Sequence, residues 1–137
     1  MLPEEVFLSH SDPDREFVSH LANVIRDHGM PSWYSRTNII GAQQWHDEIG
    51  MALNRCDWFV IILSPNSVES RWVKRELLFA LEQSHFGERI IPLLYRDCDY
   101  KKLSWTLSSI QMVDFTKNFD DGFRDLFRIW GIGYRNP

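Results

Sequence analysis

The stretch Trp58–Leu63 constrains the fold of this chain more than any other segment. Every one of its residues is apolar, and Ser64-Pro65-Asn66-Ser67 then ends the run. A strand that is apolar on both faces is typical of the centre of a parallel sheet, where helices cover the two sides. The segment therefore predicts an α/β domain with a buried central strand.

Short apolar runs and amphipathic stretches alternate along the rest of the chain. Strands are expected at residues 5–9, 31–34, 58–63, 89–95 and 110–113. Helices are expected at residues 12–28, after a polar loop at 35–43, at 70–81 and at 119–130. This order corresponds to a βα unit repeated five times, and 137 residues suit a five-stranded, doubly wound parallel sheet with helices on both faces. Pro92 cannot donate to a strand ladder, which places the fourth strand towards an edge of the sheet.

Glu76 is the most informative polar residue, because it lies inside the apolar stripe of the helix expected at 70–81. Residues four apart in an α-helix share a face, so Glu76 is in line with Trp72 and borders the residues that pack inward. Burying an ionised carboxylate costs several kcal/mol unless it has a partner or a ligand. Two interpretations stay open: Glu76 serves a ligand, or it lies at the edge of the stripe and pairs with Arg71 or Lys74.

The composition excludes several classes of protein. A formal charge of -4 argues against a general nucleic-acid binder, which needs a basic face. The longest apolar run is too short to span a bilayer, and the N-terminus lacks the features of a signal peptide. Cys56 and Cys98 stand outside any CxxC pattern and are compatible with a reducing compartment. We expect a cytoplasmic protein without direct nucleic-acid contact or a membrane span, in which residues 1–137 form a single domain that a longer chain could carry as one module.

Fingerprints of several common enzymes are missing. The chain has no GxGxxG after its first strand, no GxxxxGK[ST], no HExxH and no GxSxG. A conventional dehydrogenase, a P-loop enzyme, a zinc hydrolase and a serine hydrolase are therefore disfavoured, and no metal site is expected. A phosphoacceptor receiver domain would need an aspartate after the third strand, where Ser64 stands.

The carboxyl ends of the strands are the expected place for a ligand in a doubly wound sheet. The segments after Leu8, Tyr34 and Leu63 therefore form the candidate site. The segment Ser9–Pro13 combines small polar side chains with a helix N-terminus, where backbone N–H groups can receive an anion. An ordinary capped helix has the same pattern, so this segment alone identifies no ligand.

Four segments, in order and at suitable separations, resemble the TIR domain family over essentially the whole chain. They are Val6–Ser11, Ile40-Gly41 through Trp45, Val60–Pro65 and Ser70-x-Trp72-x-x-x-Glu76-Leu77. The resemblance implies a flavodoxin-like sheet and one of two functions: cleavage of NAD+ at its nicotinamide glycosidic bond, or non-catalytic signalling by TIR–TIR assembly. Adaptor-type members generally lack the glutamate, so Glu76 favours the enzyme, a NAD+ glycohydrolase or cyclase in immune or anti-phage defence signalling. NAD+ would be the substrate, and no cofactor is implied.

The resemblance also implies roles for individual residues. Glu76 corresponds to the catalytic glutamate, whose carboxylate can stabilise the positive charge that develops on the ribose. Trp72, one turn earlier, lines or supports the nicotinamide pocket. Nucleotide contacts are implied for His10, Ser11, Asp12 and Ile39. Some relatives carry arginines after the first strand and an acid in the loop, so the phosphate and ribose contacts must differ in this chain.

The loop at residues 35–43 is the implied oligomerisation surface. Arg36, Ile39, Ile40 and Gly41 combine a charge, two apolar side chains and a glycine in a segment suited to docking on a neighbouring copy. In this family such docking often completes the active site. We therefore expect activity to depend on self-association, triggered by a fused or partner sensor domain. The product could be ADP-ribose, a cyclic isomer or a transferred ADP-ribosyl group, and the sequence does not distinguish these.

Overall fold

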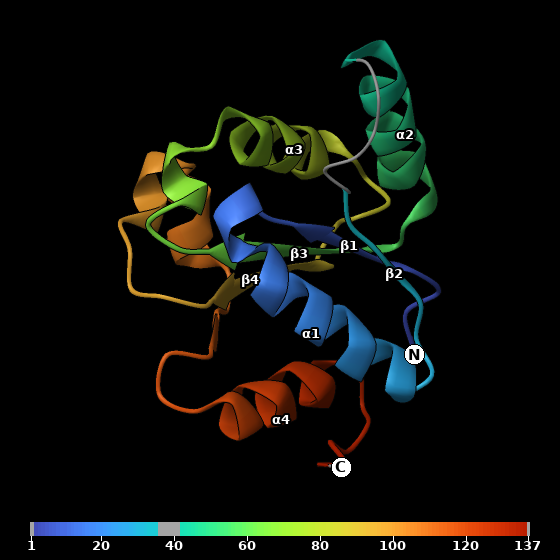
Figure 1. Ribbon diagram of the computed structural model, residues 1–137, viewed down its shortest axis with the longest axis vertical. Helices are drawn as coiled ribbons and strands as arrows, with labels where there is room; N and C mark the ends of the chain where they lie inside the picture. Colours follow the sequence, from blue (N-terminus) through green and yellow to red (C-terminus); the bar gives the residue numbers. More distant parts are fainter. Residues whose placement is uncertain (1, 36–41, 137) are drawn as a thin grey trace.

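Five parallel strands in the order β2-β1-β3-β4-β5 form the centre of the molecule (Figure 1). The computed structural model describes residues 2–35 and 42–136. The strands are β1 (Val6–Ser9), β2 (Ser32–Trp33), β3 (Trp58–Leu63), β4 (Ile90–Leu94) and β5 (Val113–Asp114). The α-helices are α1 (Arg15–Asp27), α2 (Ala42–Arg55), α3 (Arg71–Glu82) and α4 (Phe119–Ile129). The predicted flavodoxin-like, doubly wound fold is confirmed, because the chain runs from β1 outward to β2 and then adds β3, β4 and β5 on the other side.

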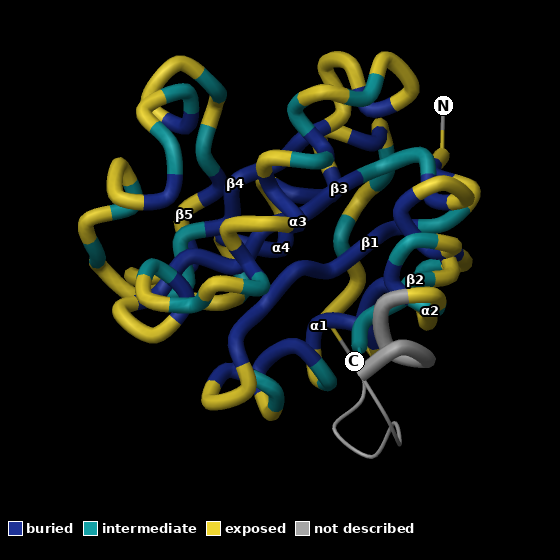
Figure 2. The backbone as a smooth tube through the Cα atoms, turned by 90° about the horizontal axis from the view of Figure 1, so that it is seen from above, coloured by how far each residue is buried: buried dark blue, intermediate teal, exposed yellow. Residues whose placement is uncertain are grey.

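Helices cover both faces of the sheet, and each face has its own apolar core (Figure 1). On one face α1 and α4 pack with Val6 and Leu8 of β1. On the other face α2 and α3 pack with Phe7, Phe59 and Ile61. Figure 2 shows that the buried residues follow the strands, whereas the exposed residues concentrate in the loops and on the outer helix surfaces. No helix in residues 2–35 and 42–136 is long and apolar enough to cross a membrane.

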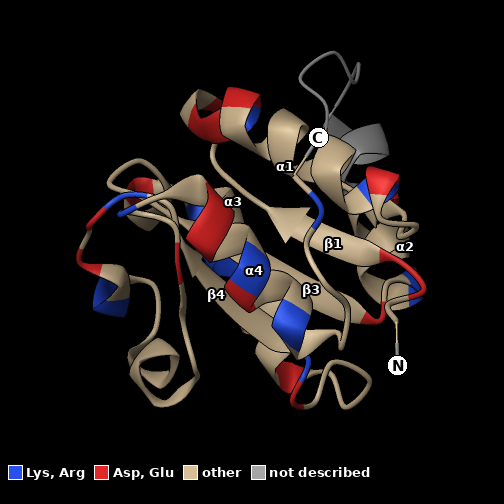
Figure 3. Ribbon diagram, turned by 90° about the horizontal axis from the view of Figure 1, so that it is seen from below, with Lys and Arg blue, Asp and Glu red and all other residues tan. Residues whose placement is uncertain are grey.

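The strand Trp58–Leu63 occupies the central position that its apolar sequence predicts. Its first residue is half-buried and the rest are buried. It pairs with β1 as far as Ser9↔Ile61 and with β4 as far as Leu63↔Leu94. Strands β1, β3 and β4 carry no charged residue, and most charged residues of the described chain lie on helices and loops (Figure 3).

The fourth βα unit differs from the expectation. The connection between β4 and β5 contains no α-helix, and instead carries the short 3-10 helices η3 (Tyr100–Lys102) and η4 (Trp105–Ser109). Only Leu103 and Leu107 are buried between residues 100 and 109, so this segment lacks the apolar stripe of a covering helix. The fifth strand is correspondingly short and begins at Val113 rather than at residue 110.

Pro92 lies in β4, which is next to the edge strand β5, so the predicted place of this strand towards an edge is confirmed. Phe59 donates its backbone N–H to Arg89 O, and Tyr95 donates to Leu63 O. Successive residues of a strand direct their backbone groups to opposite sides, so the odd-numbered residues of β4 bond to β3. The nitrogen of Pro92 therefore faces β5, which pairs only with the two following residues of β4. The ladder loses no hydrogen bond at the proline.

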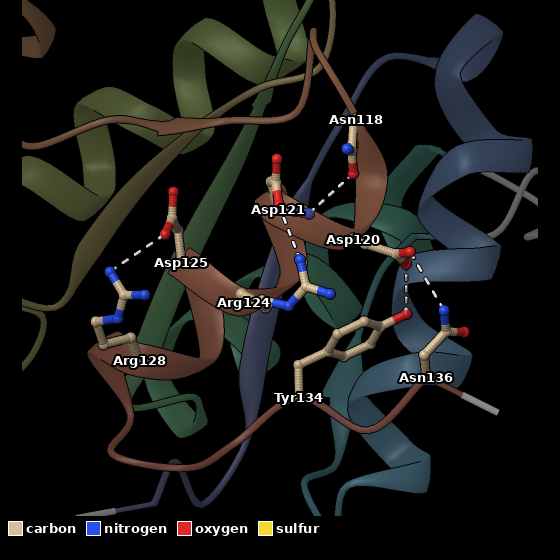
Figure 4. A network of polar contacts seen from close by, with 8 residues as sticks. All are labelled: Asn118, Asp120, Asp121, Arg124, Asp125, Arg128, Tyr134 and Asn136. Atoms are coloured by element: carbon tan, nitrogen blue, oxygen red, sulfur yellow. Dashed lines mark hydrogen bonds and ion pairs between the residues drawn. The ribbon is translucent and has the colours of Figure 1, made fainter.

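The last described residues fold back over α4 and reach α1. Gly131 has a φ of 74°, which reverses the chain after the helix. The Tyr134 hydroxyl then donates to Asp120 Oδ1 at 3.2 Å, and Asn136 Nδ2 donates to Oδ2 of the same carboxylate at 3.2 Å (Figure 4). The backbone N–H of Arg135 donates to His28 Nε2 at 2.9 Å. These bonds join the C-terminal segment to the outer side of the α1 and α4 layer.

Candidate active site

The carboxyl ends of β1 and β3 lie side by side at the point where the chain reverses its direction of growth across the sheet. Such switch points are where doubly wound sheets bind ligands. All the buried polar or charged residues of the described part of the chain belong to this region and to the elements that follow these two strands. They are Ser9, His10, Ser11, Asp14, Ser64, Ser67 and Glu76. The remaining core is apolar, so this cluster is the clearest candidate for a functional site.

Glu76 is buried against the end of β1. Glu76 is 7% exposed, and the Ser9 hydroxyl donates to its Oε1 at 2.6 Å. Helix α3 holds it there, because the Ser70 hydroxyl accepts the Val73 N–H at the start of the helix and Val73 and Leu77 pack into the core. Burial raises the pKa of the Glu76 carboxyl to about 7, and the Ser9 hydrogen bond opposes that rise.

The alternative interpretation of Glu76, a surface pair with Arg71 or Lys74, is wrong. Both basic side chains belong to exposed residues of α3, whereas Glu76 is buried. No lysine or arginine among the described residues lies within ion-pair distance of the carboxylate. A buried carboxylate held by one hydroxyl and no cation is costly for folding, and such costs are typical of functional sites.

A second buried carboxylate, Asp14, links the two strand ends. Its Oδ2 accepts the hydroxyl hydrogen of Ser11 at 2.8 Å and that of Ser64. Ser64 is in turn bonded to Ser67, which lies in the 3-10 helix η2 (Ser67–Glu69): the Ser67 hydroxyl accepts the Ser64 N–H at 2.9 Å. This arrangement fixes the segment after β1 to the segment after β3.

His10 carries a buried nitrogen that has no hydrogen-bond partner in the described part of the chain. Its Nδ1 is 3.4 Å from Leu8 O, and its Nε2 has no hydrogen-bond partner among the residues that the structure describes. The ring meets Tyr34 edge-on, with centroids 5.8 Å apart. Burial lowers the pKa of His10, which favours the neutral imidazole. The unused nitrogen of a neutral imidazole can donate a hydrogen bond to a ligand or accept one from it, depending on the tautomer.

The other predicted site residues are distributed unevenly. Ser11 lies in the buried cluster, whereas Asp12 is exposed and pairs with Arg15 at 3.0 Å. Trp72 is half-buried on α3, one turn before Glu76, and the Arg75 guanidinium lies 5.3 Å from the centre of its ring. Arg36, Ile39, Ile40 and Gly41 lie outside the described residues.

Sequence reasoning placed Ser9 and Ser64 in the candidate segments after the strand ends but gave them no role, and it did not single out Asp14 or Ser67. One local signal was present, because Ser9 is a polar residue that ends an apolar strand. The pairing of serines with carboxylates across the sheet has no local signal. Among residues 2–35 and 42–136 no group of three or more histidine, cysteine, aspartate or glutamate side chains could hold a metal ion.

The five-stranded sheet defines a doubly wound α/β domain, and the buried, hydroxyl-bonded carboxylate of Glu76 marks a candidate ligand site at its strand ends. The family model described as TIR domain matches residues 6–127. The chain belongs to the TIR domain family.

Three relatives illustrate the range of this similarity. The chain is 25% identical over 88 residues to the 2' cyclic ADP-D-ribose synthase BtTIR of Bacteroides thetaiotaomicron, with 64% of this chain and 31% of that protein covered. It is 32% identical over 91 residues to the NAD(+) hydrolase TirS of Staphylococcus aureus, with 65% of this chain and 32% of that protein covered. The chain thus spans about a third of the length of each. Its fold is similar to the TIR domain of the Toll-related receptor TRR-2 from Hydra magnipapillata, at 20% identity and a TM-score of 0.75, with 93% of this chain and 98% of that chain covered.

Proposed function

We propose that this domain cleaves the bond between nicotinamide and ribose in NAD+, with Glu76 as the catalytic carboxylate. The observation that carries the proposal is the burial of Glu76 at the switch point, held by one hydroxyl and by no cation of the described residues. The names of two relatives, a 2' cyclic ADP-D-ribose synthase and a NAD(+) hydrolase, support this choice of substrate.

The chemistry requires stabilisation of a positive charge. When the glycosidic bond breaks, its electron pair goes to the nicotinamide nitrogen, which becomes neutral, and C1′ of the ribose becomes oxocarbenium-like. An ionised carboxylate in a site with little water lowers the energy of that cation far more than it would in bulk water. Water that then adds to C1′ and loses a proton gives ADP-ribose, whereas a ribose hydroxyl of the same molecule gives a cyclic product. Glu76 is assigned the role of stabilising the cation and orienting the ribose hydroxyls.

The remaining residues of the site are assigned to binding. The unpartnered Nε2 of His10 and the segment Ser11–Asp12 would contact the nucleotide, and Trp72 would line or support the nicotinamide pocket. Ile39 would reach the nucleotide from the loop. NAD+ serves as the substrate, and no separate cofactor takes part.

Self-association is assigned to the same loop. Arg36, Ile39, Ile40 and Gly41 would dock on a second copy and complete the site, so that a fused or partner sensor domain controls activity through assembly. In this proposal the domain acts in immune or anti-phage defence signalling inside the cell.

The experiment compares nicotinamide release from NAD+ by the wild type and by Glu76→Gln, with products separated by chromatography. Both proteins are assayed over a range of concentrations and with a crowding agent, and light scattering records their assembly. Glu82→Gln is the matched control, because it removes an exposed carboxylate from the last turn of the same helix. Release by the wild type and by Glu82→Gln, but not by Glu76→Gln, is expected. An assembled wild type that releases no nicotinamide would contradict the proposal and would favour a non-catalytic interaction module.

A further inference from the structure

We propose that Ser9 is a positioning residue for this reaction: its hydroxyl holds Oε1 of Glu76 and thereby leaves Oε2 to face the substrate. The inference rests on the proposed function of Glu76. It gives the two carboxylate oxygens of Glu76 different roles, and it attributes this difference to Ser9, a residue of the sheet.

The position of Ser9 is determined by the backbone ladder. It is the last residue of β1, is 1% exposed, and lies opposite Ile61 of the central strand. The backbone position of Ser9 is therefore fixed, and its side chain has few accessible conformations. Glu76 comes from a helix 67 positions later in the chain, and the bond between the two side chains is 2.6 Å long.

One hydroxyl can hold one oxygen only. Serine has a single hydroxyl hydrogen, and here it is given to Oε1 of Glu76. Among the residues that the structure describes, no group donates to Oε2. A glutamate side chain has three rotatable bonds, so a short buried bond at one oxygen restricts the orientation of the other. The carboxylate is thus oriented before a ligand arrives, which is the condition for efficient electrostatic stabilisation.

Among the residues that the structure describes, few other groups around Glu76 could control its charge. Helix α3 packs against β1, β3 and η2. The two strands carry no titratable side chain, and Glu69 of η2 is exposed and pairs with Lys102. On the segment after β1, His10 and Asp14 are the buried titratable residues, and the Asp14 carboxylate is already bonded to Ser11 and Ser64, whereas Asp12 is exposed and pairs with Arg15. On α3 itself Arg71, Lys74 and Arg75 belong to exposed residues. The Ser9 hydroxyl is therefore the group that favours the ionised carboxylate against the effect of burial.

The test compares Ser9→Ala with the wild type in two measurements. The first is the pH profile of nicotinamide release between about pH 5 and pH 9, separated into kcat and KM. The second is the titration of the Glu76 carboxyl by carbon-13 NMR in the protein without NAD+, with the signal assigned by its loss in Glu76→Gln. The second measurement does not depend on turnover.

Loss of the hydroxyl is expected to move both midpoints to higher pH by about one unit, because a hydrogen bond to a charged group stabilises that charged form. At a pH where Glu76 is ionised in both proteins, kcat is expected to fall by on the order of tenfold while KM stays close to the wild-type value. Ser9→Thr keeps the hydroxyl and should restore both values. Ser64→Ala is the matched control, because it removes a buried hydroxyl that serves Asp14 rather than Glu76, and it should leave the Glu76 midpoint in place.

The outcomes separate this inference from the proposed function. If the wild type releases nicotinamide and Ser9→Ala leaves both midpoints and kcat unchanged, the role of Ser9 is overturned and the function of Glu76 stands. If the wild type releases no nicotinamide, the proposed function fails, and with it the role of Ser9 in the reaction, even where the NMR midpoint moves. If Ser9→Ala does not fold, Ser9→Cys provides the same comparison, since a thiol fills a similar volume and is a weak donor.

Discussion

Ser64 and Asp14 are 50 positions apart in the chain, and the Ser64 hydroxyl donates to Asp14 Oδ2 in the buried space between two strand ends. The Ser11 hydroxyl donates to the same oxygen. Together with the bond between Ser9 and Glu76, this gives the site two carboxylates that are held by hydroxyl groups rather than by basic side chains of the described residues. The bonds Ser9–Glu76 and Ser64–Asp14 each join the segment around the end of β1 to an element that lies elsewhere in the sequence.

Asp14→Ala is expected to lower the free energy of unfolding by about 2–4 kcal/mol, because Ser11 and Ser64 would both lose a buried acceptor. Urea unfolding measures this loss. Asp12→Ala is the control, since that side chain is 77% exposed and its change should stay within about 0.5 kcal/mol. Equal losses in the two variants would contradict a structural role for the buried bonds.

The stability of the wild type is expected to fall as the pH rises through the titration of Glu76. Burial raises the folded-state pKa of Glu76 from its ordinary value of 4.5 to about 7, so the protonated carboxyl contributes its full stabilisation below pH 4.5, and this contribution is lost as the pH rises through 7. The loss amounts to about 3 kcal/mol. Glu76→Gln cannot ionise, so its stability relative to the wild type should increase between pH 5 and pH 8. Unfolding curves in urea at the two pH values measure the difference, and parallel changes in both proteins would exclude a raised pKa.

Gly122→Ala is expected to destabilise the fold by about 1–3 kcal/mol, although alanine is the better helix former. A Cβ atom at this position of α4 would lie 2.6 Å from the ring of Phe115, which is buried. Gly50→Ala on α2 is the control, because no described atom lies within 4 Å of its new Cβ, and it should raise stability by about 0.5–1 kcal/mol. Thermal unfolding of the two variants should therefore shift in opposite directions. A stabilised Gly122→Ala protein would show that α4 can move away from the sheet at little cost.

The C-terminal segment is expected to detach when the Tyr134 ring is removed. That ring stacks on Phe123 at 5.2 Å, and its hydroxyl bonds to Asp120. Tyr134→Ala should increase hydrogen exchange at Ile132 and Arg135, whereas Tyr134→Phe keeps the stacking and should have a much smaller effect. Mass spectrometry of the exchanged protein measures both. Equal exchange in Tyr134→Ala and the wild type would mean that the other contacts of the segment suffice.

The sequence predicts the sheet and the helices well because their signals are local. The apolar run at Trp58–Leu63 and the stripe around Glu76 follow from residues that are close in the chain, and the structure places both as expected. The 3-10 helices before β5 were missed because a connection with two buried leucines has no clear period. Pro92 correctly indicated a strand towards an edge of the sheet, but the direction of its backbone nitrogen depends on pairing with β3, which no local pattern contains.

The candidate site was predictable only in part, because only some of its residues have a local signal in the sequence. The burial of Glu76 could be predicted because a carboxylate in an apolar stripe breaks a local rule. Its partner Ser9 could not be found in that way, since the two residues meet only when α3 packs over the end of β1. Asp14 was hidden as well, because an aspartate near the start of a helix is usually a solvated end residue.

The register of β1 has a consequence for how this site can vary. Side chains alternate along a strand, so Ser9 faces the same side of the sheet as Phe7, the side that α3 covers. A shift of one residue in the pairing with Ile61 would turn Ser9 to the opposite layer and leave Glu76 without its donor. The backbone ladder therefore determines which side chain meets Glu76, whereas substitutions in the surrounding loops can change the ligand while this pair stays in place.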